Sequence, residues 1–257
     1  MENNLVWEPV RQELAHWAEA GRTAQLWLRD DDAVEPTDAL ETLLAVASAS
    51  LIPVTIAVIP AFTGEALAAR LSDEKGVCVA VHGWSHRNFA EPDEKKQELG
   101  SHRPVEIVHR ELRDGYVLLK RLHPARFIPI LVPPWNRIDG GLVPGLPALG
   151  FEMLSAYGRA KGDGPLPQLN THLDIMDWHG TGGGRETADL ASELTRHLAE
   201  RRKGQDEPIG VLTHHLVHDE NAWTFLAELF ALTAIDPAVQ WISPADAWKP
   251  RKNCSSD

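Results

Sequence analysis

Short apolar runs alternate with longer amphipathic runs along the whole chain. Seven of the apolar runs have the length and the β-branched or aliphatic content of strands. They lie at residues 25–29, 54–59, 77–82, 127–132, 151–155, 169–177 and 209–214. Their continuous apolar character predicts burial on both faces, as in a parallel sheet.

The segments between these runs carry the periodicity of helices. Residues 36–50 follow the pattern of a helix with proline in its first turn, and residues 65–71 and 185–202 resemble outer helices. In the segment 104–122, apolar residues recur at helical spacing and form the stripe of a helix that covers a sheet. About seven strand–helix units in succession predict an α/β fold with a parallel sheet.

The chain shows no fixed-period repeat and no low-complexity linker. A length of 257 residues is compatible with one domain, so we expect a single domain over 1–257 with a core at about 24–248. The polar segment 249–257 is expected to be a flexible tail. Residues 139–167 and 181–184 are rich in glycine or proline, which predicts surface loops.

Charge and cysteine content narrow the classes of partner. The net charge of −12 argues against nucleic acid or an anionic membrane as a partner, because both would be repelled, and favours a neutral or cationic small molecule or oligosaccharide. Cys78 and Cys254 are the two cysteines, too few for a disulfide framework or a cysteine-rich metal site. No export signal or membrane span is recognisable, so a cytoplasmic location is expected.

Polar residues gather where the first predicted strand ends. Arg29, Asp30, Asp31 and Asp32 directly follow an apolar run. Adjacent carboxylates repel one another, so a fold that brings them to one strand end normally supplies a cation or a shared proton. A solvated turn in which Asp32 caps the next helix is an equally good reading of this segment alone.

A pair of histidines follows the third predicted strand. His82 and His86 are four residues apart, and in one helical turn this spacing places both imidazoles on one face. Two surface histidines would show the same spacing. Together with one aspartate, however, they form a ligand set that leaves coordination positions open for water and substrate. We therefore expect one divalent cation on Asp32, His82 and His86, with zinc as the first expectation and iron, cobalt, nickel or manganese also compatible.

Two more segments place chemistry beyond strand ends, where folds of this class carry their ligands. In residues 131–137, two prolines fix the backbone before Trp135; a rigid loop with a packed tryptophan is the simpler reading. Residues 210–215 end in His214 and His215. Either histidine can deliver a proton near neutral pH, and either can instead be a core histidine bonded to the backbone.

The sixth predicted strand contains two acids, Asp174 and Asp177. Alternation of side chains along a strand puts residues three apart on opposite faces. Unless the strand has ended before Asp177, at most one of the two is expected to enter the site.

Taken in order, these motifs resemble the polysaccharide deacetylase superfamily, the family 4-like carbohydrate esterases with a chitooligosaccharide-deacetylase homology domain. The resemblance spans about residues 26–215 and rests on five short motifs in the family's order. It implies a distorted (β/α) barrel of seven strands. In that family a paired aspartate supplies a base and then a metal ligand, which implies Asp31 and Asp32, with Asp30 and Asp31 as the alternative pair. The family's two-histidine motif is matched residue for residue by HGWSH at 82–86.

The third family motif begins with an arginine that orients the basic aspartate, followed by proline and an aromatic residue whose backbone N–H holds the oxyanion. Pro134 and Trp135 match this motif, but Val132 stands in the place of the arginine. Arg29 or Arg137 is expected to substitute for it.

The last two family motifs imply the acid and its surroundings. Asp174 and Asp177 belong to the acid–x–x–acid–Trp segment, whose aspartate pairs with the motif arginine in the family. The closing Leu–x–His motif implies His214 as the proton donor, with His215 as its rival.

The resemblance implies a hydrolase that removes an acyl group, N-acetyl above all, from an amino sugar or glycan. Trp84, Trp135 and Asn136 are expected to contact that substrate, the tryptophans by stacking on sugar rings. Three alternatives remain: a cytoplasmic non-sugar amidase or deformylase, a non-catalytic carbohydrate-binding relative, and a two-carboxylate glycosidase using Asp31 and Asp177. The glycosidase leaves the two histidines without a role.

Overall fold

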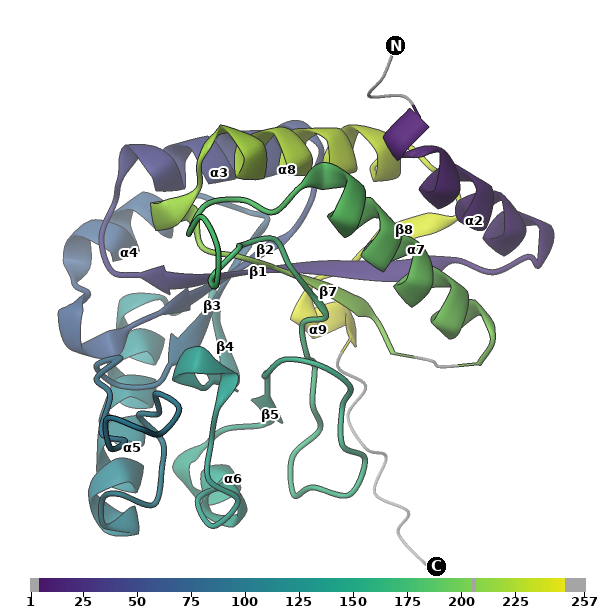
Figure 1. Ribbon diagram of the computed structural model, residues 1–257. Coiled ribbons are helices and arrows are strands. Elements are labelled where there is room, and N and C mark those ends of the chain that lie inside the picture. The colour runs from purple at the N-terminus through teal and green to yellow at the C-terminus, as the bar shows by residue number, and fades with distance from the viewer. Residues whose placement is uncertain (1–4, 205–206, 248–257) are drawn as a thin grey trace, which may run out of the picture.

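A parallel sheet, curled into a half-barrel, forms the centre of the computed structural model, which describes residues 5–204 and 207–247 (Figure 1). The strand order is β5-β4-β3-β2-β1-β7-β6, and every pairing is parallel. The strands are β1 (Ala24–Ala33), β2 (Val54–Val58), β3 (Val77–His82), β4 (Phe127–Val132), β5 (Met153–Leu154), β6 (Leu173–Asp174), β7 (Ile209–Thr213) and β8 (Val239–Trp241). The predicted α/β fold with seven parallel strands in a distorted barrel is confirmed.

An eighth strand, β8, was not predicted. It pairs with residues 24–26 at the start of β1, whereas β2 begins to pair with β1 only at Leu28. Strand β8 therefore fills the edge of β1 that β2 leaves free. The predicted strands at 151–155 and 169–177 are much shorter in the structure, because each keeps only two ladder residues before its chain turns into a loop.

Helices cover the outer side of the sheet, with α3, α8, α7 and α2 along one stretch and α4 and α5 around the next (Figure 1). The helices are α2 (Glu8–Glu19), α3 (Asp38–Ala49), α4 (Glu65–Leu71), α5 (Val105–Leu122), α6 (Leu146–Leu149), α7 (Thr187–Arg202), α8 (Glu220–Thr233) and α9 (Pro244–Ala247). Four 3-10 turns, η1 (Pro60–Phe62), η2 (Pro134–Asn136), η3 (Val143–Gly145) and η4 (His215–Val217), lie in the connections. Helices α2 and α8 were not predicted, although both bury apolar residues at helical spacing.

The start of α3 corrects one local prediction. Thr37 is the N-cap, and its hydroxyl accepts a hydrogen bond from the Leu40 N–H at 3.1 Å. Pro36 therefore precedes the helix rather than lying in its first turn. Asp32 is part of β1 and caps nothing, so the reading of the aspartate cluster as a helix cap is wrong.

Both faces of the central strands are buried, as predicted, and all five residues of β2 are inaccessible. The larger apolar cluster fills the space between sheet and helices. A smaller cluster, with Trp27, Ala57, Ala80 and Val132 among its members, fills the inside of the curled sheet. Trp27 donates its indole N–H to the Asn170 carbonyl at 3.1 Å, which satisfies its polar atom. This inner cluster supports the strand ends that carry the polar motifs.

Three expectations drawn from composition concern membrane spans, the cysteines and the C-terminal segment. None of the helices within 5–204 and 207–247 is long and apolar enough to cross a membrane. Cys78 is a free, partly buried cysteine in β3. Cys254 and the predicted tail 249–257 lie outside the described residues.

Candidate metal centre

A bulge in β1 turns two consecutive aspartates toward the same space. Between Asp30 and Ala33, β1 advances three residues while β2 advances two, so one residue of β1 is extra. Asp32 sits at this irregularity with φ of 77°, an uncommon value for a non-glycine residue. In a regular strand Asp31 and Asp32 would face opposite sides. The bulge lets both carboxylates line one cavity.

Asp32 converges with His82 and His86. One carboxylate oxygen of Asp32 lies 3.0 Å from His82 Nε2 and 3.3 Å from His86 Nε2. One potential ligand atom from each residue falls within 4.8 Å of the other two. His82 Nδ1 lies 3.0 Å from the Val132 carbonyl, which can only accept, so Nδ1 carries the proton and Nε2 keeps a lone pair for an ion. The donor set therefore fits a divalent cation.

The charges within this cluster favour a cation between the three side chains. Burial opposes ionisation of Asp32, but the hydrogen bond and positive charge of His82 hold the pKa of that carboxyl well below its usual range. Burial likewise opposes charging His82, yet the Asp31 and Asp32 carboxylates raise its pKa. His86 has a lowered pKa, first through burial and then through the proximity of His82. A bound dication would replace the proton that the carboxylates attract to this site.

The two histidines approach through a loop and not through a helical turn, which corrects the prediction. His82 is the last residue of β3, and residues 83–86 have no regular structure. Gly83 and His86 have positive φ values of 57° and 54°. A Cβ on Gly83 would lie 2.2 Å from Glu98 Oε2 and 2.6 Å from Pro134 Cγ. Glycine is therefore required at position 83 both for its backbone angle and for space.

Glu98 is a site residue that the sequence analysis missed. Its carboxylate is fully buried and accepts hydrogen bonds from the Trp84 N–H, the Ser85 N–H and the Ser85 hydroxyl. These donors belong to the loop between the two histidines. In the sequence, Glu98 is one of several acids in the polar segment 91–98, and its immediate neighbours do not predict that it is buried.

Asp31 lies beside the cluster and is held by Arg29. The guanidinium donates from Nε to one oxygen of Asp31 at 2.9 Å and from Nη2 to the other at 3.0 Å. It also donates to Asn136 Oδ1 at 2.6 Å and to Ser155 Oγ at 2.7 Å. Arg29 is fully buried, and Arg137 instead donates to a backbone carbonyl. Of the two arginines expected to substitute for the one missing at Val132, Arg29 is the one that contacts Asp31.

Asp30 and His215 face away from the cavity. Both are buried, and the His215 ring and backbone N–H bond to the Asp30 carboxylate, which also accepts from the Thr213 hydroxyl at 2.7 Å. Burial opposes the charge on each partner, but their mutual attraction lowers the pKa of Asp30 and raises that of His215. Neither residue lines the cavity, whereas Asp31, Asp32 and His214 do.

The cavity above the cluster measures about 850 Å³, within the range of small-molecule sites. Its wall consists of the cluster, two tryptophans and several charged or polar side chains. It is lined by Asp31, Asp32, His82, His86, Lys96, Trp135, Asn136, Arg137, Tyr157, Asp174, Met176, Asp177, Trp178, His179, Arg185 and His214. Trp84 and Pro134 are not among the lining residues.

Trp135 lies directly against the cluster. Its ring centroid is 4.3 Å from that of His86. Trp135 and Asn136 both have positive φ, 53° and 57°, in the turn η2. Such angles cost about 1–3 kcal/mol each for non-glycine residues and concentrate at functional sites. Pro134, the first residue of this turn, is buried, and its ring lies next to Gly83.

Both acids of the fourth motif line the cavity, because the strand ends before Asp177 and the alternation of side chains no longer separates them. Strand β6 ends at Asp174, and the chain after it no longer alternates between faces. Asp174 accepts from the Trp178 indole N–H at 2.9 Å, and burial raises its pKa although His214 opposes that rise. Asp177 instead accepts the Thr181 N–H at 3.0 Å and shapes the following loop.

His214 faces Trp178 edge to face, with ring centroids 4.7 Å apart. Its Nδ1 is buried and has no hydrogen-bond partner within the part of the chain that the structure describes. Since buried polar atoms are nearly always satisfied, this nitrogen is a candidate for contact with water or substrate. His214 therefore fits the cavity, and its neighbour His215 does not.

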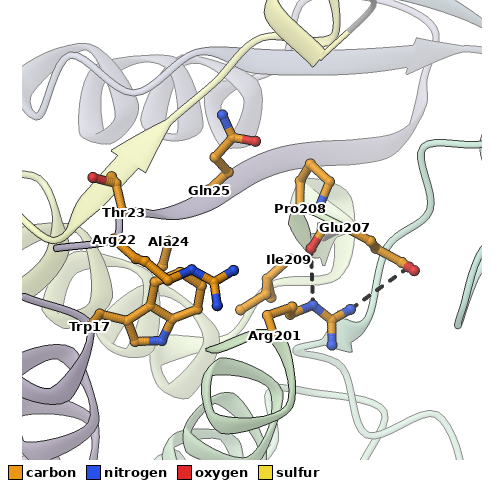
Figure 2. Close-up of a pocket in the computed structure, with 9 residues that line it drawn as sticks. All are labelled: Trp17, Arg22, Thr23, Ala24, Gln25, Arg201, Glu207, Pro208 and Ile209. Atoms are coloured by element: carbon orange, nitrogen blue, oxygen red, sulfur yellow. Dashed lines mark hydrogen bonds and ion pairs between the residues drawn. The ribbon is translucent and has the colours of Figure 1, made fainter. Parts of the chain in front are cut away.

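A second cavity, of about 110 Å³, lies at the opposite ends of β1 and β7 (Figure 2). Its buried Arg201 donates to the Glu207 carbonyl at 3.1 Å and pairs with the Glu207 carboxylate at 3.7 Å. Burial lowers the pKa of Arg201 against the pull of Glu207. This cavity is much smaller than the one above the metal centre, which measures about 850 Å³.

Comparison with solved structures identifies the fold. A proposed polysaccharide deacetylase from Mycobacterium smegmatis superposes with a TM-score of 0.66 at 17% identity, over 88% of this chain and 89% of that one. A family 4 acetyl xylan esterase from Clostridium thermocellum, solved with a cobalt ion, gives 0.56 at 13% identity, over 86% and 89%. The peptidoglycan deacetylase PdaC from Bacillus subtilis gives 0.55 at 14% identity, over 87% and 89%.

The sequence by itself matches no family model and no curated protein. The likeness is therefore one of three-dimensional structure, at identities that establish the fold alone. The chain has the distorted-barrel fold of the family 4 carbohydrate esterases, as the motif resemblance implied.

Proposed function

We propose that this chain is a metal-dependent hydrolase that removes an N-acetyl group from an amino sugar or glycan. The observation that carries the proposal is the convergence of Asp32, His82 and His86 in a cavity that also contains the Asp31 carboxylate. The solved neighbours are described as deacetylases or an acetyl esterase, which supports the same chemistry.

Asp32, His82 and His86 would hold the cation, leaving positions open for water and substrate. A divalent cation at such a site supplies Lewis acidity, which lowers the pKa of water toward about 7 and polarises an acyl carbonyl. Zinc suits this ligand set, and the cobalt in the Clostridium thermocellum neighbour suits it as well. Val132 contributes by fixing the tautomer of His82 through its carbonyl.

Asp31 is the proposed base. Its two oxygens are fixed by the Arg29 fork, and each oxygen retains a lone pair that can take a proton from the attacking water. Arg29 carries a full positive charge at all working pH values and therefore keeps Asp31 in one orientation. This pair performs the role that the family assigns to an arginine from the third motif.

His214 is the proposed acid that protonates the departing amine. It lines the cavity, and its ring packs edge to face against Trp178. The backbone N–H of Trp135 is the proposed donor to the tetrahedral oxyanion. The Trp135 ring, beside His86, offers a face on which a sugar can stack.

Acetate release from N-acetylated chitooligosaccharides tests the proposal. We expect activity in the metal-loaded protein, loss of activity on chelation, and recovery on adding zinc or cobalt. Asp31→Asn should lower kcat at least a hundredfold while metal stays bound, because the base is lost and the ligands are not. His86→Ala should lose the metal itself. Wild-type turnover in Asp31→Asn would assign the base to another residue.

Substrate screening separates the sugar from the non-sugar reading. N-acetylated sugars and N-formyl or simple ring amides should be assayed side by side with the same metal-loaded preparation. Turnover of the amides without any acetate release from sugars would favour an amidase or deformylase on this barrel. Metal binding without turnover of either class would favour a non-catalytic relative.

A further inference from the structure

Glu98 is a buried carboxyl side chain beneath the loop that carries His86. The Arg103 guanidinium contacts the Glu98 backbone carbonyl at 3.3 Å and forms its ion pair with Glu111. Burying the polar atoms of a carboxyl group carries a desolvation cost.

Three hydrogen bonds offset part of it, and all three come from the loop between the candidate ligands. The Ser85 N–H and hydroxyl donate to Oε1 at 2.7 and 3.0 Å, and the Trp84 N–H donates to Oε2 at 3.2 Å. Hydrogen bonds to a charged acceptor are stronger than those between neutral groups. The carboxylate thus fixes two consecutive peptide units of a loop that is also held by bonds from the Gly83 N–H to the Val132 carbonyl at 3.1 Å and from the Ala61 N–H to the Trp84 carbonyl at 2.9 Å.

The loop is also confined from the other side. The absent Cβ of Gly83 leaves room for Glu98 Oε2 and for the ring of Pro134. His82 is anchored by β3 and by Val132, but His86 lies at the far end of the loop with φ of 54°. The position of His86 therefore depends on the loop, and Glu98 is the side chain that binds the two peptide N–H groups nearest to His86.

We propose that Glu98 is a positioning residue of the metal centre, an inference that rests on the proposed metal site. Its carboxylate holds the loop 82–86 in the conformation that brings His86 to Asp32 and His82.

The test is metal affinity in Glu98→Gln, measured by competition with a chromophoric chelator for Zn²⁺ and Co²⁺. The amide keeps the shape of the carboxylate but removes the charge and turns an NH₂ group toward N–H donors. We expect the Kd to rise about 10- to 100-fold, the usual effect of losing a partner that orients a ligand. In the metal-free protein, amide hydrogen exchange at Ser85 should accelerate. Glu94→Gln is the matched control. Glu94 precedes Glu98 by four residues in the same connection between β3 and α5, but it is half-exposed and paired with His102, so this variant should change neither readout.

Ser85→Ala is the second variant in case Glu98→Gln does not fold. It removes one hydroxyl bond and leaves both backbone donors, so a smaller rise in Kd of about three- to tenfold is expected. Unchanged affinity in Glu98→Gln, or in Ser85→Ala if only that variant folds, would overturn the role of Glu98. If the wild-type protein binds neither Zn²⁺ nor Co²⁺, the proposed metal site itself fails, which is a different result.

Discussion

Replacement of Arg29 by lysine tests whether the fork on Asp31 matters or only the positive charge. Arg29 donates to Asp31, Asn136 and Ser155 from a fully buried position. Lysine keeps the charge but has three donors at a single nitrogen, so it cannot engage both oxygens of Asp31 in the same planar geometry.

The free-energy cost of Arg29→Lys follows from the contacts that lysine cannot make. At least one charge-assisted bond to Asp31 is lost, worth about 1.5–3 kcal/mol, and a buried acceptor on Asn136 or Ser155 is left without its partner, at about 1–3 kcal/mol. We expect Arg29→Lys to lower the free energy of unfolding by about 2.5–6 kcal/mol. A base displaced by about 1 Å costs on the order of a hundredfold in kcat.

Two assays measure these effects separately. Urea unfolding of the metal-free proteins gives the free energy of unfolding, and acetate release under metal saturation gives kcat. Arg137→Lys is the control, because Arg137 lines the same cavity but donates only to the Lys96 carbonyl among the described residues. It should change stability by less than about 0.5 kcal/mol.

The reasoning is refuted if Arg29→Lys retains both wild-type kcat and wild-type stability. A loss of stability with full kcat would show that Arg29 supports the fold and does not orient the base. Equal losses in Arg29→Lys and Arg137→Lys would show that the assays respond to the loss of any guanidinium group from the cavity wall.

Two further predictions concern the loop and the outer helices. Gly83→Ala should lower the free energy of unfolding by about 2–4 kcal/mol and weaken metal binding. Gly21 has a similar φ but open space around it, so Gly21→Ala should cost only about 1 kcal/mol. Equal losses in the two variants would show that crowding by Glu98 plays no role. The hydrogen bond with His197, and then Arg185, lowers the pKa of Glu193 to about 2 from an ordinary 4.5. Its stabilisation is therefore complete above pH 4.5 and lost as pH falls toward 2, so Glu193→Gln should be about 1–2 kcal/mol less stable than wild type at pH 7 and nearly equal at pH 2. A pH-independent difference in urea unfolding would contradict this.

Local patterns in the sequence predicted the central strands well. Strands β3 and β4 match their predicted bounds, and β2 and β7 differ by one residue, because each is a continuous apolar run that ends at polar or proline residues. Strands β5 and β6 were too long in the prediction, since apolar residues that pack as irregular chain look the same as ladder residues. Strand β8 has only three residues and depends on the free edge of β1.

The site required information that no local pattern carries. Asp31 and Asp32 face the same cavity because β1 has a bulge against β2. Regular alternation of side chains would have placed them on opposite sides of the strand. The convergence of His82 and His86 depends on a loop rather than on helical spacing. Glu98 lies at the end of the polar segment 91–98, and its burial beneath that loop results from tertiary packing.

The Asp31 carboxylate binds an arginine even though the third motif carries Val132. Val132 breaks the third motif in the sequence, yet Arg29 reaches Asp31 from two residues earlier on the same strand. Residues i and i+2 of a strand share a face, which makes this contact possible. The sequence allowed both Arg29 and Arg137, and only the three-dimensional arrangement distinguishes them.

An anomalous-scattering map of crystals soaked in cobalt tests the metal centre most directly. The account predicts one strong peak about 2.0–2.2 Å from an oxygen of Asp32 and from Nε2 of both His82 and His86, with no peak at these positions in His86→Ala crystals. A strong peak bound by other residues, or an empty site between these three in a protein that holds one equivalent of cobalt, would contradict it.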